Sequence, residues 1–229
     1  MGARLLGLEE PGVTLEVALH LGTLVSILVY YRRRVTELTV GLARREPEAV
    51  RYAGSILLGS VPAAAAYAVF DKKIEAAFES PAIVGALLCV TGLILLSTVA
   101  ARRAERPLSY GRAFGIGCAQ ACALLPGISR SGATVVAARH AGVGAAKAAE
   151  FSLLLGAVAM TGAAVVKLAG PGAVAGSFPA SRLLFGAAVS GVVGYVAIAW
   201  LVRALASGRL WLFGIYCLAS GGLGLALFL

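Results

Sequence analysis

Six stretches of this sequence are long and apolar enough to cross a lipid bilayer as helices, for which about twenty residues each are needed. Only 14% of the 229 residues are charged, whereas a soluble domain carries about a quarter. A soluble globular fold and a disordered chain are therefore excluded, and the sequence predicts an all-α polytopic membrane protein with the lipid bilayer as its surroundings. The six predicted spans are 13–31, 52–70, 82–101, 148–166, 183–202 and 210–229.

The chain is basic, with 20 Lys and Arg against 11 Asp and Glu and a formal net charge of +9. In a soluble protein this balance would indicate a nucleic-acid partner. Here the basic residues lie in segments between apolar spans rather than on one face, which is typical of loops on the cytoplasmic side of a membrane. We therefore expect no nucleic-acid partner.

A seventh apolar region, 113–138, differs from the six spans because its middle is polar and rich in turn-forming residues. A helix that faces lipid would not tolerate Pro126, Gly127 and the Ser-Arg-Ser-Gly run at 129–132. The segments on either side are each too short to span a bilayer. The sequence therefore predicts a re-entrant helical hairpin over 113–142, which leaves the membrane on the side where it enters.

The distribution of Lys and Arg among the loops supports this hairpin, because these residues accumulate in cytoplasmic loops. With a re-entrant hairpin, fourteen of them lie on the cytoplasmic side and five outside; with a seventh span, the numbers become twelve and seven. The larger asymmetry favours the hairpin together with six spans. It also places both chain ends outside.

The predicted order is three spans, a hairpin and three further spans, which suggests an inverted repeat. A repeat unit with an odd number of spans ends on the opposite side of the membrane, so the next copy must have the opposite orientation. The pattern E-x-x-L-x-L-G occurs at 16–22 and again at 150–156, an offset of 134 residues. At this offset the counterpart of the broken region would precede Met1. We therefore predict a single membrane domain over 1–229, with a first repeat (1–101) that lacks its hairpin and a second repeat (102–229) that has one.

The turn of the predicted hairpin combines a guanidinium with three hydroxyl groups, within Leu-Pro-Gly-Ile-Ser-Arg-Ser-Gly-Ala-Thr at 125–134. A fixed charge in the membrane costs about 2.5–3.5 kcal/mol on insertion scales, so Arg130 needs a partner. A phosphate fits this need, because a guanidinium binds its oxygens in pairs and a helix opening at Gly132 adds free backbone N–H groups. Gly127 and Gly132 allow close approach to the backbone. The sequence therefore predicts an anion site at this turn.

Catalysis at this turn requires further groups. Ser129 or Ser131 could attack a phosphorus atom only with a base or a metal to activate it, and the hairpin contains neither. Glu16 and His20, one turn apart in the first span, are candidates for this task. Gln120, on the first half of the hairpin, could hydrogen-bond across the hairpin or to a ligand.

A purely structural interpretation of the same residues is also open. Ser and Thr side chains would cap the second half-helix, and Arg130 would pair with a carboxylate such as Glu16 or Glu150 only to hold the fold. Glu16 and His20 could equally lie at the membrane interface.

Much of this sequence resembles one family, the bacterial undecaprenyl-diphosphate phosphatases or bacitracin-resistance proteins. The segment SYGRAFGIGCAQACALLPGISRSGATVVAARHAGVGAAKAAEFSLLL, 109–155, is similar to the second signature of that family. The run TLEVALHLGTLVSILVYYRRR resembles its first full span, and FGIY at 213–216 resembles its C-terminal region. The resemblance covers essentially the whole chain.

This resemblance implies a hydrolase that removes the terminal phosphate of undecaprenyl diphosphate at the outer face of the bacterial plasma (inner) membrane. It implies recycling of the lipid carrier for peptidoglycan and other wall polymers, and hence a part in cell-wall biogenesis, cell shape and resistance to the antibiotic bacitracin. It also implies a divalent cation, Mg²⁺ or Ca²⁺, and six spans with two inverted re-entrant hairpins. The protein residues that hold the metal are unassigned.

Carried over by position, the resemblance makes Ser129 the nucleophile or a phosphate ligand and Arg130 the phosphate clamp. Gly127, Ser131, Gly132 and Thr134 become supporting contacts to the substrate phosphate. Gln120, Glu16 and His20 are auxiliary candidates.

The sequence departs from the family at its first signature, a glutamate-rich helix followed by a Pro-Val-Ser-Ser turn and a His. That signature has no counterpart here, so we expect part of the active site to be missing from the chain as given, which leaves open whether this chain is active by itself. Val158 stands where relatives often have proline.

Two other classes of function stay open. A non-catalytic binder or flippase of lipid diphosphates would keep the Arg130 clamp and need no general base. A secondary transporter would also use an inverted repeat with a broken helix, and carboxylates within its spans would favour it. The sequence leaves open whether the chain forms a homodimer.

Overall fold

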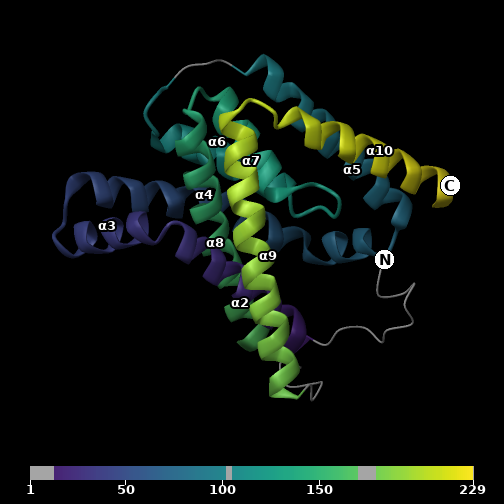
Figure 1. Ribbon diagram of the computed structural model, residues 1–229, viewed down its shortest axis with the longest axis horizontal. Helices are drawn as coiled ribbons and strands as arrows, with labels where there is room; N and C mark the ends of the chain where they lie inside the picture. The colour runs from purple at the N-terminus through teal and green to yellow at the C-terminus, as the bar shows by residue number, and fades with distance from the viewer. Residues whose placement is uncertain (1–12, 102–104, 170–178, 229) are drawn as a thin grey trace. The chain divides into compact units, whose positions relative to one another are not determined.

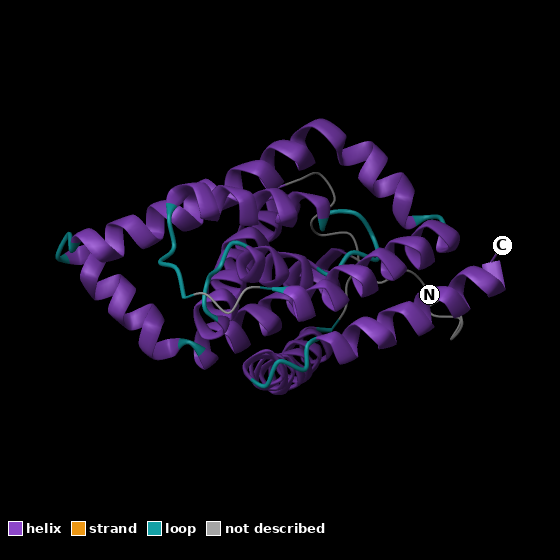
Figure 2. Ribbon diagram, turned by 90° about the horizontal axis from the view of Figure 1, so that it is seen from above, coloured by secondary structure: helices purple, strands orange, loops and turns teal. Residues whose placement is uncertain are grey.

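The structure is a computed structural model that describes residues 13–101, 105–169 and 179–228. Throughout these ranges the regular secondary structure is helical (Figures 1 and 2). The predicted all-α class is therefore confirmed. The elements are α2 (Val13–Tyr30), α3 (Arg32–Ala43), α4 (Pro47–Phe78), α5 (Pro81–Leu96), the 3-10 turn η1 (Ser97–Ala100), α6 (Tyr110–Cys122), α7 (Arg130–His140), α8 (Ala145–Ala169), α9 (Ala180–Ala206) and α10 (Trp211–Phe228).

Five of the six predicted spans form helices that are long and apolar enough to cross a membrane, so the chain is a polytopic membrane protein. These are Pro47–Ile74, Pro81–Ala100, Ala145–Val166, Ala180–Ala206 and Trp211–Phe228. The stretch predicted at 13–31 is helical, but its apolar part is the shorter Val17–Tyr30.

Two helical segments extend beyond the predicted spans. The chain continues after Tyr30 into α3, which begins with three arginines. Helix α4 begins with Pro47. Proline suits the first turn because backbone N–H groups there have no partner within the helix, so the lack of an N–H costs nothing. The helix continues past the apolar stretch to Phe78. Apolar stretches therefore located the spans, while the helices themselves also include polar flanks.

The chain divides into two compact units, and each combines segments from both halves of the sequence. One comprises Met1–Thr36 and Ala157–Trp200; the other comprises Glu37–Gly156 and Leu201–Leu229. The division into repeats at 1–101 and 102–229 is a different one, and it stays a prediction.

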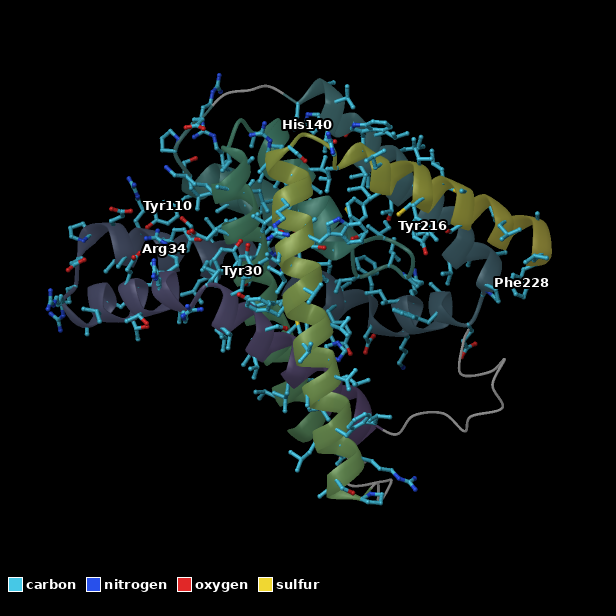
Figure 3. All side chains as sticks on the ribbon, in the orientation of Figure 1. Tyr30, Arg34, Tyr110, His140, Tyr216 and Phe228 are labelled. Carbon is cyan, nitrogen blue, oxygen red and sulfur yellow. The ribbon has the colours of Figure 1, made fainter. Side chains whose placement is uncertain are left out.

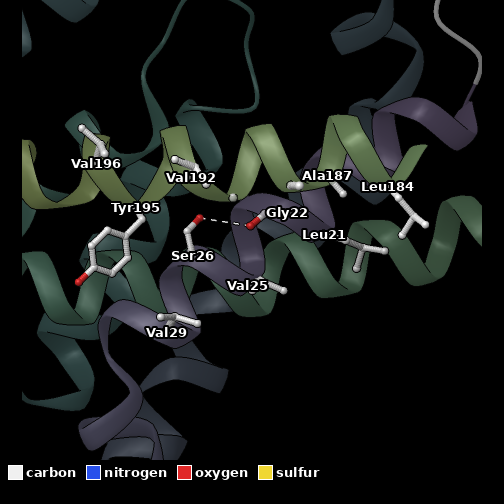
Figure 4. Close-up of a pocket in the computed structure, with 12 residues that line it drawn as sticks. Leu21, Gly22, Val25, Ser26, Val29, Leu184, Ala187, Val192, Tyr195 and Val196 are labelled. Atoms are coloured by element: carbon white, nitrogen blue, oxygen red, sulfur yellow. Dashed lines mark hydrogen bonds between the residues drawn. The ribbon is translucent and has the colours of Figure 1, made fainter. Parts of the chain in front are cut away.

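In the first unit, α2 packs closely on α9 through small residues. A Cβ atom at Gly22 would lie 2.2 Å from the carbonyl oxygen of Ala187, and the hydroxyl oxygens of Thr23 and Ser190 are 2.9 Å apart. Small side chains and hydroxyl pairs are the usual contacts of helices within membranes. Beside this contact the two helices form an apolar groove, whose lining includes Leu21, Val25, Val29, Leu184, Val192 and Val196 (Figure 4).

In the second unit, glycines bring α5 and α10 into backbone contact (Figure 1). A Cβ at Gly92 would lie 2.8 Å from the carbonyl oxygen of Gly214, and one at Gly221 would lie 2.7 Å from that of Gly85. Each helix thus contributes two glycines seven residues apart. The first glycine of α5 pairs with the second of α10, and the second of α5 with the first of α10, as in antiparallel helices related by a local two-fold axis. An inverted repeat would contain such a pair, although the repeat itself stays a prediction.

The second unit also contains the helical hairpin of α6 and α7. A buried apolar cluster joins both helices to α8 through Ile116, Ala138, Phe151 and Leu155. On its other side, α7 packs against α5 through Val135, Val136 and Leu95. A short helix that protein surrounds in this way needs no contact with lipid.

Candidate active site

The turn between α6 and α7 lies against α5. Gly127 has a φ of +98°, a conformation that only glycine adopts readily. A Cβ at this position would also lie 2.4 Å from the carbonyl oxygen of Val84. The glycine predicted from the motif is therefore required twice, by the turn and by the close approach to α5.

Ser129 is the N-cap of α7, and its Oγ accepts a hydrogen bond from the backbone N–H of Gly132 at 3.2 Å. Because of this cap, α7 begins at Arg130, and the predicted helix start at Gly132 was wrong by two residues. Serines cap α5 and α6 in the same way, at Ser80 and Ser109. The predicted capping of the second half-helix by a serine is thus confirmed for Ser129.

Arg130 occupies the first position of α7, and its guanidinium lies over the backbone of α8. The Nη1 group donates to the carbonyl oxygen of Gly156 at 2.8 Å. A Cβ at Gly156 would lie 2.9 Å from both Cζ and Nη2 of Arg130. The absence of a side chain at Gly156 therefore makes room for the guanidinium, a function that the sequence did not reveal.

The first turn of α7 combines this guanidinium with backbone donors. The first N–H groups of any helix lack partners within the helix, and they carry the positive end of its dipole. Gly132 uses its N–H for the cap, while Ser131 is half-buried at the second position of the helix. Arg130, Ser129 and Ser131 thus gather hydrogen-bond donors around one helix start, which is the arrangement that binds an anion.

Thr134 lies one turn further along α7 and is fully buried. Its hydroxyl donates to the carbonyl oxygen of Arg130 at 2.8 Å, and it forms a short hydrogen bond with the hydroxyl of Ser152 on α8. Ser152, which is also buried, had not been singled out from the sequence. These contacts connect α7 to α8 one helical turn after Arg130.

Gln120 is 2% exposed and lies on the face of α6 that also buries Ala113, Ile116 and Gly117. Within the described ranges, neither Oε1 nor Nε2 of this side chain has a hydrogen-bond partner. A buried amide without partners costs about 1–3 kcal/mol for each unsatisfied group. A ligand or a water molecule that supplies both a donor and an acceptor would remove this cost.

Thr91 on α5 is the residue that the sequence analysis missed at this turn. It is 1% exposed, and its Oγ1 donates to the carbonyl oxygen of Gly127 at 2.8 Å. The same atom accepts from the backbone N–H of Ser129 at 3.0 Å. The only sequence signal was a hydroxyl within the apolar run PAIVGALLCVTGLILL.

The two remaining candidates, Glu16 and His20, lie on α2 in the first unit. His20 is exposed, and the side chain of Glu16 lies outside the described part. Glu150, the other carboxylate considered for Arg130, accepts a hydrogen bond from the hydroxyl of Tyr52 at 3.1 Å. Glu16 and His20 thus belong to a different unit from the hairpin turn.

The C-terminal end of α7 makes other contacts than its N-terminal end. Nη1 of Arg139 donates to the carbonyl oxygen of Val143 at 2.7 Å. His140 is labelled in Figure 3, and its Nε2 lies 3.0 Å from the hydroxyl oxygen of Ser97. At 1.5 Å per residue these groups lie about 15 Å from the start of α7. Arg139 is therefore a matched control for Arg130.

The polar groups at the turn do not by themselves form a cation site. Mg²⁺ and Ca²⁺ take oxygen ligands, with carboxylates foremost. In residues 13–101, 105–169 and 179–228, no three His, Cys, Asp or Glu side chains are grouped so that they could hold a metal ion. The turn instead provides hydroxyls and a guanidinium, which do not fit a divalent cation by themselves.

The fold and the site together define a class: a polytopic membrane protein with a helical hairpin whose second helix, α7, is largely buried in protein and whose turn gathers hydrogen-bond donors suited to an anion. Residues 1–223 match the family described as Bacitracin resistance protein BacA. The chain is 39% identical to undecaprenyl-diphosphatase of Geobacter metallireducens, covering 98% of this chain and 87% of that one. It is also 39% identical to the enzyme of that name from Salinibacter ruber (98% and 88% covered) and 34% identical to the one from Desulfatibacillum aliphaticivorans (95% and 85%).

This chain belongs to the bacitracin resistance protein family.

Proposed function

We propose that this protein is a membrane phosphatase that hydrolyses undecaprenyl diphosphate to undecaprenyl phosphate and inorganic phosphate. The observation that carries the proposal is the guanidinium of Arg130, held at the carbonyl of Gly156 beside the N-terminus of α7. The names of its relatives supply the substrate. At this site a terminal phosphate would meet a planar pair of N–H donors and the first backbone N–H groups of a helix.

The chemistry assigned to each residue follows from its contacts. Arg130 binds the oxygens of the terminal phosphate and stabilises the charge that develops on them. The only hydrogen bond described for Oγ of Ser129 is the one it accepts from Gly132, so its own proton can be donated to the phosphate. In hydrolysis, a water oxygen bonds to the terminal phosphorus while the bond from phosphorus to the bridging oxygen breaks. Thr134 then acts indirectly, by holding α7 against α8.

The resemblance also implies a divalent cation. Because the described residues provide no cluster of ligands for one, we propose that any such cation is held mainly by the oxygens of the diphosphate itself, as Mg²⁺ commonly is. We place the reaction at the outer face of the bacterial plasma membrane, where it would return the carrier lipid to cell-wall synthesis and confer resistance to bacitracin.

The direct test is phosphate release from undecaprenyl diphosphate by the purified protein in detergent, with Mg²⁺ or Ca²⁺ present. We expect release that stops when EDTA is added and that falls about 10²-fold in Ser129→Ala, because a donor to the reacting phosphate is lost. Binding of the lipid diphosphate without any release would support the binder or flippase instead. If the protein neither binds nor hydrolyses the lipid diphosphate, the proposal is refuted and a transporter is favoured.

A substitution of Gln120 separates function from stability. We expect Gln120→Met to raise the thermal unfolding midpoint, because an apolar side chain of similar length removes two unsatisfied buried groups, and to lower phosphate release if the amide binds a ligand. Both are measured on the same detergent-purified sample. Cys118→Ala, at an exposed position on the same helix, is the control. A higher midpoint with unchanged release would show that the amide has no part in the reaction.

A further inference from the structure

We infer that Thr91 is a positioning residue for the reaction: its hydroxyl holds the backbone on both sides of Ile128 and thereby sets the place of Ser129 at the start of α7. The inference rests on the proposed function of Ser129 and Arg130. No chemistry is assigned to Thr91 itself.

The hydroxyl of Thr91 makes one bond as a donor and one as an acceptor. It donates to the carbonyl oxygen of Gly127 at 2.8 Å and accepts from the N–H of Ser129 at 3.0 Å. These two backbone groups flank a single residue, so one side chain fixes the chain where it turns into α7. The direction in which Ser129 presents its Oγ depends on this stretch of backbone.

Thr91 differs from several other helical hydroxyls in the described part of the chain. Thr36, Ser55, Ser60 and Thr161 each donate to the carbonyl oxygen four residues earlier in their own helix. That bond is the common one for Ser and Thr in helices. Thr91 donates across to the hairpin turn instead. Its hydroxyl therefore serves the turn and not its own helix.

Burial makes these two bonds necessary. Thr91 is 1% exposed, and Gly127 lies so close to α5 that a Cβ would come within 3.0 Å of the backbone nitrogen of Leu88. Backbone groups away from water must find partners within the protein. Without the hydroxyl, the carbonyl of Gly127 and the N–H of Ser129 would lose them, and the turn would shift to find others.

A shift of the turn should affect the reaction more than substrate binding. A misplacement of about 1 Å at a reacting group can cost about 10²-fold in rate. Both bonds described for this hydroxyl go to the hairpin turn, so we expect the binding of the substrate's lipid chain to depend little on it. A loss confined to the reaction therefore appears in kcat while KM stays nearly constant.

The test compares Thr91→Val, which keeps the shape and removes the hydroxyl, with Thr91→Ser, which keeps it. We expect Thr91→Val to lower kcat for phosphate release by about 10- to 100-fold with KM within about threefold, and Thr91→Ser to retain most of the activity. Thr161→Val, which removes a hydroxyl bonded only within its own helix, should leave kcat unchanged. A folded Thr91→Val protein with full kcat, or a Thr91→Ser protein as impaired as Thr91→Val, would overturn the inference.

Two further measurements keep the inference testable on its own. In a Ser129→Ala background, Thr91→Val should have little additional effect if Thr91 acts through Ser129. Hydrogen exchange of the backbone amides at 127–130 should become faster in Thr91→Val but not in Thr91→Ser, whether or not the protein hydrolyses the lipid. Faster exchange without phosphate release by the unmodified protein would refute the proposed function alone; unchanged exchange would refute the positioning of the turn.

Discussion

Phosphate release from undecaprenyl diphosphate is expected to fall about 10³-fold when Arg130 is replaced by alanine, because the substitution removes the charged donor that stabilises the phosphate oxygens in the transition state. Arg130→Lys should lose nearly as much. An ammonium group cannot present two parallel N–H donors to a phosphate. Initial rates of phosphate release at saturating and at limiting substrate, in the same detergent, measure the loss.

The matched control for this experiment is Arg139→Ala, at the other end of α7. Arg139 also donates to a backbone carbonyl, that of Val143, so its loss tests the removal of an arginine from the same helix. We expect its activity to stay within a few-fold of the unmodified protein. If Arg130→Ala retains activity while its fold is intact, the phosphate clamp has been assigned to the wrong residue.

Gly156→Ala is the second substitution with a large expected effect, although it adds only one methyl group. The new Cβ would lie 2.9 Å from Cζ and Nη2 of Arg130, so the guanidinium must move away from the carbonyl of Gly156. The end of a long flexible side chain moves at little cost in folding free energy. We therefore expect about a 10²-fold loss of phosphate release with a nearly unchanged thermal unfolding midpoint.

Gly162→Ala provides the control on the same helix, because in the described part of the chain nothing beyond its own helix backbone and chain neighbours lies within 4 Å of the Cβ that it would add. This variant should match the unmodified protein in activity. The double variant Arg130→Ala with Gly156→Ala should be no worse than Arg130→Ala alone, since Gly156 acts only through the guanidinium. Additive losses would mean that Gly156 contributes in another way.

The spans could be predicted from the sequence because a helix in lipid needs a continuous apolar stretch of a certain length, which is a local property. The ends of α4 and the presence of α3 could not, because polar flanks such as Arg32 continue a helix without any apolar signal. The hairpin was predictable for the opposite reason. Its turn contains Pro126 and Arg130, which lipid does not tolerate in a spanning helix.

The candidate site was predictable only in part. Ser129, Arg130 and the glycines of the turn were identified because their types in this order indicate an anion site. The motif did not show that Ser129 caps a helix starting at Arg130, which places the helix start two residues earlier than predicted. Nor did it show that Thr134 contacts Ser152, because that contact depends on how α7 packs on α8.

The sequence by itself determined that this chain is an all-α membrane protein, where its apolar spans lie and where its hairpin turns, since each of these follows from residues adjacent in the chain. Only the tertiary structure decided what holds the turn and the guanidinium. Thr91 lies 38 residues from Ser129, and Gly156 lies 26 residues from Arg130. The sequence around one threonine or one glycine in an apolar helix does not indicate which residue it will contact. The packing of α5 and α8 against the hairpin brings each pair together.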